Sequence, residues 1–250
     1  SAIIARDKRW SELIYWRTLK GNDSRLTLHY LAQALDLDLQ WDGGIQRAPP
    51  DKRIYLDNLQ RTLWIALVVS LACIVLGYPV AYMIATAPPR LAKILILLVL
   101  LPFWTSLLVR TAAWVIVLQK AGIVNDALLG LGLVDEPLAL IFNRTGVYIS
   151  MVHILLPFMI LPLYGVMKGI PGDHVRAAAS LGATPRAAFL SVYFPQTLPG
   201  LAAGCLLVYV IALGFYITPM LIGGGSDQML AYLIAQYATN TANWGLAGGL

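Results

Sequence analysis

The chain has 250 residues, of which 58% are hydrophobic and only 12% are charged, and its mean hydropathy is +0.70. This composition excludes an ordinary soluble domain, because a water-soluble core of this length does not need so much apolar side chain. The net charge of +5 lacks the basic and aromatic clustering of nucleic-acid binders, so the composition indicates a protein of the lipid bilayer that binds no nucleic acid.

Residues 1–56 form a polar segment in which basic and acidic residues nearly balance. Asp23 or Ser24 is a candidate N-cap for a helix that ends before Gly43. The apolar positions of this helix recur at helical spacing and are Leu28, Leu31, Ala32 and Leu35. The segment is predicted to be a small amphipathic cap outside the membrane rather than an independent domain.

Residues 57–250 are predicted to form a helical membrane domain, because a span needs about 20 mostly apolar residues. Four stretches meet this length, and the single Lys, Arg, Asp or Glu inside them is Arg110. The stretches are 62–87, 94–119, 145–167 and 197–222. A short helix at the membrane boundary is expected over 229–237, and residues 244–250 resemble the opening turns of a further span. We expect that another span precedes Ser1 and that the last one is completed after Leu250.

Orientation follows from Lys and Arg, which are enriched in short cytoplasmic loops. The loop after the first span carries Arg90 and Lys93, and the region between the third and fourth spans is also basic. The loop at 120–144 holds three acidic residues and is assigned to the opposite side. Residues 1–56 are therefore predicted to be extracytoplasmic.

The sequence carries no motif of a catalytic site. It lacks the GxxxxGK[ST] phosphate loop, HExxH and GxSxG, and neither Cys nor His pairs have metal-ligand spacing. Cys73 and Cys205 lie in apolar spans and are interpreted as structural thiols, and His153 is interpreted as a packing residue. The chain is predicted to be no enzyme, with no catalytic residue, metal or cofactor of its own.

A polar, proline-punctuated hairpin, Val175–Gly200, separates the third and fourth spans. Asp173 is expected to cap a helix whose small residues allow another surface to approach closely. Gly182 permits a sharp bend, and Thr184 is expected to cap a second helical piece with Pro185 in its first turn. The residues alone leave two interpretations open, an ordinary cytoplasmic loop and a docking element.

The hairpin also carries a spaced pattern, in which Arg176-Ala177-Ala178 is followed after three residues by Gly182 and after nine more by Val192-x-Phe194-Pro195. This pattern resembles the EAA loop of permease subunits of bacterial ATP-binding-cassette (ABC) importers. In that loop, the residues EAA are followed after three residues by Gly and after nine more by I-x-L-P. Arg176 departs from it by reversing the charge of the usual Glu.

Longer strings resemble the spermidine/putrescine-type branch of this family. They are LGYPVAY at 76–82, LPFWTSLLVRTAAW at 101–114, DEPLAL at 135–140, HILLPFMILPLY at 153–164 and LGFYITPMLIGG at 213–224. The resemblance covers about residues 62–250. It implies an all-α, polytopic membrane protein with the type I permease fold of ABC importers, whose six-span pattern lacks its first span and part of its last here.

The resemblance also implies a function, the ATP-driven import of a small solute, a polyamine or related nitrogenous compound, across the bacterial inner membrane by alternating access. The implied partners are an ATPase dimer that binds ATP and Mg, a second homologous permease subunit and a soluble periplasmic solute-binding protein. The cytoplasmic coupling loop is placed at about 169–195. Its implied ATPase-coupling residues are Asp173, Arg176, Ala177, Ala178, Gly182, Ala183 and Arg186.

Arg110 is the strongest single candidate for the translocation pathway. A guanidinium inside a span is costly, so it faces a wet cavity or a partner, or it reaches the outer interface. Trp104, Trp114 and Tyr216 are further candidates because aromatic rings attract organic cations, although belts at the membrane interface use the same residues. Mid-span prolines, suited to rearrangement or to static kinks, are Pro79, Pro102, Pro157, Pro162 and Pro219.

Two other functions remain open at this point, an ion-coupled secondary transporter and a structural membrane subunit. The absence of acidic residues from the predicted spans speaks against the first.

Overall fold

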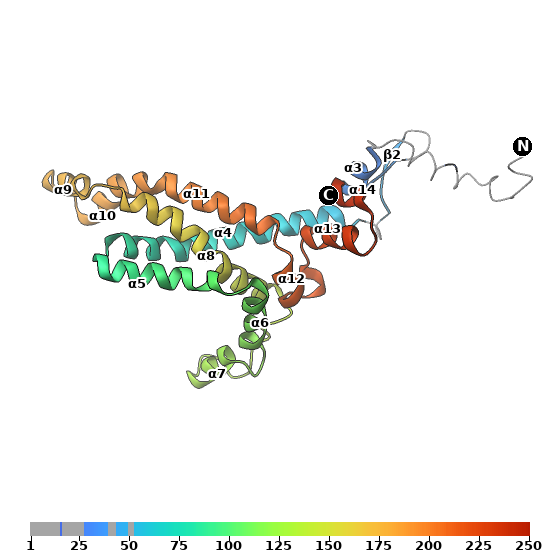
Figure 1. Ribbon diagram of the computed structural model, residues 1–250, viewed down its shortest axis with the longest axis horizontal. Coiled ribbons are helices and arrows are strands. Elements are labelled where there is room, and N and C mark those ends of the chain that lie inside the picture. Colours follow the sequence, from blue (N-terminus) through green and yellow to red (C-terminus); the bar gives the residue numbers. More distant parts are fainter. Residues whose placement is uncertain (1–15, 17–27, 40–43, 50–52) are drawn as a thin grey trace, which may run out of the picture. The chain divides into compact units, whose positions relative to one another are not determined.

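The computed structural model describes residue 16 and residues 28–39, 44–49 and 53–250. The chain divides into two compact units, a small unit of residues 1–60 and 230–250 and a large unit of residues 61–229. The described residues of each unit are mainly helical (Figure 1). The predicted division into an extracytoplasmic segment, 1–56, and a membrane domain, 57–250, stays a prediction.

The small unit caps the N-terminus of a long helix, α4 (Tyr55–Thr86). Asp36, with φ of 54°, is buried, and its carboxylate accepts hydrogen bonds from the backbone N–H groups of Tyr55 and Leu56. The first N–H groups of a helix have no partner inside the helix, so Asp36 acts as a remote cap. The other elements of this unit are α3 (Leu28–Ala34), β1 (Leu37–Leu39) antiparallel to β2 (Ile45–Arg47), α13 (Leu230–Thr239) and α14 (Trp244–Gly249).

The residues that form the core of the small unit differ from those predicted for the apolar face of the amphipathic helix. Leu31 of α3 and Leu35, directly after its end, are 52% and 53% exposed, so these two leucines do not form the core. The buried cluster consists of Tyr55, Leu233 and Leu246. The predicted caps, Asp23 and Ser24, lie outside the described residues. The two C-terminal helical pieces predicted at 229–237 and 244–250 are confirmed as α13 and α14.

The large unit is built around α8 (Arg144–Lys168) and α11 (Phe194–Leu213), which lie side by side (Figure 1). Glycines bring the helices close to Met159 of α8. A Cβ atom at Gly204 would lie 3.0 Å from the Met159 carbonyl oxygen, and one at Gly77 of α4 would lie 2.9 Å from the Met159 Cγ. Small residues at such seams let helices pack tightly in a membrane, where burial from water does not drive association.

Within the described part of the chain, four helical segments are long and apolar enough to cross a membrane. They are Tyr55–Thr86, Leu107–Gly130, Arg144–Lys168 and Pro185–Leu213. The number agrees with the sequence prediction. The third segment closely matches the predicted span 145–167, whereas the first matches the predicted span 62–87 at its end but begins earlier, at Tyr55.

The prediction of one helix over 94–119 is wrong. The chain forms α5 (Pro89–Leu100), a short 3-10 helix η3 (Leu101–Trp104) and α6 (Leu107–Leu118), followed by α7 (Ile123–Gly130). Pro102 lacks a backbone donor, and Thr105 is extended. Ser106 then starts α6, because its side chain accepts a hydrogen bond from the backbone N–H of Val109 at 3.2 Å.

The prediction of one helix over 197–222 is wrong at both ends. The helix begins earlier, because α10 (Pro185–Ala188) and a π-helical turn, η4 (Phe189–Tyr193), lead directly into α11. It ends at Leu213, and α12 (Ile217–Ile222) is a separate helix followed by the 3-10 helix η5 (Gly225–Asp227). Polar contacts hold α12 in place, since Thr218 lies 3.2 Å from Thr111 of α6, hydroxyl to hydroxyl.

Candidate functional site

The hairpin between α8 and α11 consists of α9 (Gly172–Ser180), a turn and α10. The predicted turn is confirmed, since Gly182 has φ of +87° and Thr184 accepts a hydrogen bond from the N–H of Ala187 at 3.3 Å. The prediction that Asp173 caps α9 is wrong. Pro171 takes the N-cap position, and Asp173 lies in the first turn, where its charge faces the positive end of the helix dipole.

Most predicted coupling residues lie on the surface of this hairpin. The side chains of Asp173 and Arg176 are 84% and 81% exposed, and they form a loose ion pair of 3.5 Å. An exposed pair of this kind contributes little, so both groups remain available to a partner. Of the other predicted residues, the exposed ones are Ala177, Gly182 and Arg186, and the half-buried ones are Ala178 and Ala183.

Leu181 is a surface residue of the hairpin that the sequence analysis missed. It is 90% exposed at the end of α9, directly before the turn glycine. A leucine in an otherwise polar loop, next to a glycine, was the available signal. Its position beside the exposed Asp173 and Arg176 makes it a candidate contact residue of the hairpin.

The opposite side of α9 is attached to the membrane helices. His174 Nδ1 lies 2.8 Å from Gln196 Oε1, and Gln196 Nε2 donates to the carbonyl of Val192 at 2.7 Å. Because the amide nitrogen of Gln196 is the donor in the second bond, its oxygen accepts from His174. Val175 packs against the buried cluster of α8 and η4 that includes Met167 and Tyr193. The hairpin is therefore anchored on one side and exposed on the other.

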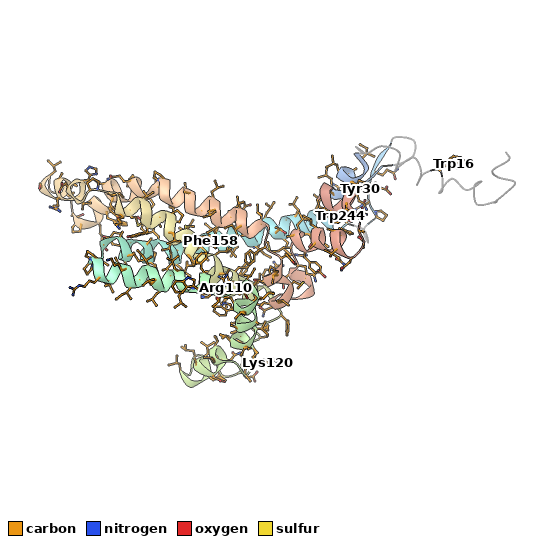
Figure 2. The ribbon with its side chains drawn as sticks, viewed as in Figure 1. Trp16, Tyr30, Arg110, Lys120, Phe158 and Trp244 are labelled. Atoms are coloured by element: carbon orange, nitrogen blue, oxygen red, sulfur yellow. The ribbon has the colours of Figure 1, made fainter. Side chains whose placement is uncertain are left out.

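A second candidate site is a pocket of about 170 Å³ between α6 and α8, lined by Arg110, Ala113, Trp114, Val117 and His153. Figure 2 labels Arg110. Trp114 Nε1 donates to His153 Nδ1 at 3.1 Å. The Nε of Arg110 is buried and has no hydrogen-bond partner among the described residues. The structure thus brings together two predicted pathway residues, Arg110 and Trp114, with His153, which the sequence analysis interpreted as a packing residue.

The other two predicted pathway residues do not line this pocket. Trp104 ends η3 and is 76% exposed, and Tyr216 precedes α12 and is 37% exposed. Their assignment to the pathway stays a prediction.

Metal-ligating groups do not cluster in the described residues, where no group of three or more His, Cys, Asp or Glu side chains comes together. Cys73 is buried, Cys205 is half-buried, and both are free thiols. An ion pair lies outside the pocket, where Arg144 Nε is 2.9 Å from Asp227 Oδ1.

Residues 62–250 match the family described as the binding-protein-dependent transport system inner membrane component. The chain belongs to this family. The spermidine/putrescine transport system permease protein PotB of Escherichia coli strain K12 is 37% identical over 191 residues, covering 76% of this chain and 70% of that protein. The inner membrane ABC transporter permease protein YdcU of the same strain is 34% identical over 181 residues, covering 67% of this chain and 57% of that protein.

Solved structures support the fold. A bacterial ABC transporter involved in the import of the acidic polysaccharide alginate aligns with a TM-score of 0.57 at 18% identity, covering 77% of this chain and 71% of that chain. A bacterial alginate ABC transporter in complex with an alginate pentasaccharide-bound periplasmic protein aligns with a TM-score of 0.58 at 19% identity, covering 78% of this chain and 71% of that chain.

These similarities confirm the predicted relationship to spermidine/putrescine-type permeases and the type I permease fold. The family member described here is a multi-pass inner membrane permease subunit of a binding-protein-dependent ABC importer.

Proposed function

We propose that this permease subunit imports a polyamine or a related nitrogenous solute by alternating access, and that a separate ATPase dimer drives it through the hairpin. The observation that carries the proposal is the hairpin itself, which is anchored to α11 on one side while Asp173, Arg176 and Leu181 are exposed on the other. A surface built in this way suits docking to a partner.

Energy for transport comes from the partner, because the sequence has no phosphate-binding loop. ATP and Mg bind to the ATPase subunits, whose closure displaces the hairpin. A second homologous permease subunit completes the pathway, and a periplasmic binding protein delivers the solute. Solute binding and ATP binding each favour one of the two states of the spans, which is the requirement for coupling.

The sidedness follows from charge. Arg90 and Lys93 in the loop after α4, and Arg176 and Arg186 in the hairpin, belong on the cytoplasmic side under the positive-inside rule. Residues 1–56 then lie in the periplasm, since long segments cross the membrane largely regardless of their charge.

The solute class rests on the PotB proteins, whose names state spermidine/putrescine transport. The pocket of Arg110, Trp114 and His153 has an aromatic wall and no carboxylate among its lining residues. Aromatic faces attract organic cations, whereas Arg110 repels them. The carboxylates that neutralise a polycation are therefore assigned to the binding protein or to the second permease subunit.

The test is uptake into proteoliposomes that contain this chain with its own ATPase, second permease and binding protein. ATP-dependent accumulation of labelled putrescine or spermidine is expected. Amino-acid derivatives serve as competitors, and their preferential uptake, with no polyamine uptake, would refute the polyamine assignment. Transport that persists without the ATPase, driven by an ion gradient, would instead identify a secondary transporter. A Gly182→Asp complex that transports normally would count against coupling through the hairpin.

A further inference from the structure

The turn that joins the hairpin to α11 is a π-helix, η4 (Phe189–Tyr193). The backbone N–H of Phe194 donates to the carbonyl of Phe189, five residues earlier, in place of the usual four. Turns of this kind are rare and are frequently found at functional sites. Pro195 and Pro199 follow, and each removes a backbone donor from the next turns.

Side chains of α11 hold this turn together. Gln196 Nε2 donates to the carbonyl of Val192, and the hydroxyl of Thr197 donates to the carbonyl of Phe194, both at 2.7 Å. The same Gln196 accepts the hydrogen bond from His174 of α9. A displacement of α9 is therefore passed directly to a side chain that bonds the backbone of the π-turn.

Aromatic rings of α4 also pack against the π-turn. The ring of Tyr82 meets those of Phe189 and Tyr193 edge to face, with centroids 5.7 and 5.4 Å apart. The ring of Tyr78 meets Phe189 edge to face at 6.3 Å and Phe194 at 5.7 Å. Edge-to-face pairs at these distances are favourable beyond the area that they bury.

A hydrogen bond between Tyr78 and Thr197 adds to these ring contacts. Thr197 has one hydroxyl hydrogen, which it donates to the carbonyl of Phe194. In the contact of 3.2 Å between Tyr78 and Thr197, the tyrosine is therefore the donor. The ring and the hydroxyl of Tyr78 thus both bind the segment that begins with the π-turn.

We propose that Tyr78 and Tyr82 are positioning residues that transmit movement of the hairpin through the π-turn to α4. This inference rests on the proposed function, since it concerns how the work of the ATPase reaches the spans. A hairpin continuous with α11 alone would move only α11. Because α4 holds the π-turn through its two tyrosines, α4 and α11 are displaced together, and both pack against Met159 of α8.

The experiment compares three variants in the complete reconstituted complex, each checked for assembly by co-purification. Tyr82→Leu removes the two ring pairs of Tyr82, whereas Tyr82→Phe keeps them. Phe158→Leu is the matched control, because it removes a ring pair with Phe103, centroids 5.0 Å apart, that does not involve the hairpin (Figure 2). The measured quantities are ATP hydrolysis and the number of solute molecules imported per ATP.

Tyr82→Leu is expected to lower the number of solute molecules imported per ATP by about tenfold. This is the fold-change that corresponds to losing the favourable interaction of two ring pairs. Tyr82→Phe is expected to restore the wild-type ratio, and Phe158→Leu to leave it unchanged. A Tyr82→Leu complex that keeps the wild-type ratio would overturn the inference. So would an equal fall in Phe158→Leu, because the effect would then be general destabilisation.

A second measurement separates this inference from the proposed function. Trypsin cleavage at Arg186 in the permease alone reports how firmly the π-turn is held, without any ATPase. Faster cleavage in Tyr82→Leu than in Tyr82→Phe would support the inference that the ring of Tyr82 holds the π-turn, and equal rates would refute it. A wild-type complex whose ATP hydrolysis does not respond to solute would refute the proposed function, whatever the cleavage rates are.

Discussion

Gly182 provides the most direct test of the hairpin, because a substitution there changes the energy of the backbone conformation without changing contacts with neighbouring atoms. Its φ of +87° is one that L-residues rarely adopt, yet a Cβ atom placed there meets nothing within 4 Å. Substitution therefore introduces backbone strain without a steric clash. A non-glycine residue in such a conformation costs about 1–2 kcal/mol, which corresponds to about 5–30-fold in an equilibrium constant.

The expected order of ATPase docking, and of uptake at limiting ATPase, is glycine, then Gly182→Asn, Gly182→Ala and Gly182→Val. Asn tolerates positive φ best among the three, and a β-branched residue tolerates it least. Gly165→Ala is the matched control, because Gly165 lies inside α8 with nothing within 4 Å and without a positive φ. Titration of the permease with ATPase in proteoliposomes measures the effect. Equal half-saturation for the wild-type chain and the three Gly182 variants would refute a role of this turn in docking.

Three further predictions concern packing and charge. Gly204→Ala is expected to lower the free energy of unfolding in detergent by about 1–3 kcal/mol, because the added Cβ lies 3.0 Å from a backbone oxygen of Met159; an unchanged thermal midpoint would contradict this. Asp227→Asn is expected to cost about 1–3 kcal/mol, because Arg144 loses a charged partner at 2.9 Å, and thermal unfolding of the variant measures it. Arg176→Glu is expected to weaken co-purification with the ATPase, and more at low salt than at high salt, if the guanidinium faces an acidic surface. Stronger binding by Arg176→Glu at low salt would contradict that complementarity.

The parts of the hairpin that the sequence predicted correctly depend on local chemistry. A threonine directly before a proline favours a helix start, and a glycine after an alanine-rich helix favours a turn with positive φ. Thr184 and Gly182 behave in this way. The Asp173 cap failed because Pro171 and Gly172 allowed the helix to begin two residues earlier, which placed the carboxylate inside the first turn.

The breaks inside two predicted spans could not be derived from apolar length. Pro79, Pro157 and Pro162 lie inside continuous helices, whereas Pro102 sits in η3, where α5 gives way to α6. The prolines look alike in the sequence, and the difference lies in what surrounds them. At Pro102 the following Thr105 is extended, and Ser106 supplies a new cap.

The pairing of Trp114 with His153 could not be predicted from the sequence either, because the two residues are 39 positions apart and meet only when α6 packs on α8. The π-turn has no sequence signature of its own. It needs the aromatic neighbours from α4, more than a hundred residues earlier than Phe189, and these contacts become visible only in three dimensions.

Docking and transmission use different residues of the same hairpin, so they can be separated experimentally. The exposed set, with Arg176 and Leu181, determines what the hairpin binds, whereas the inner set, with His174 and Gln196, determines what moves when it is displaced. Exposed ion pairs contribute little to the stability of the hairpin, so changes at Arg176 can alter assembly without loosening α9. Changes at Tyr82 should have the opposite effect, because its ring contacts are with Phe189 and Tyr193 of η4 and not with the exposed residues of α9. A variant of Arg176 that assembles poorly should therefore still import the wild-type amount of solute per ATP in each complex that forms, whereas Tyr82→Leu should assemble normally and import less.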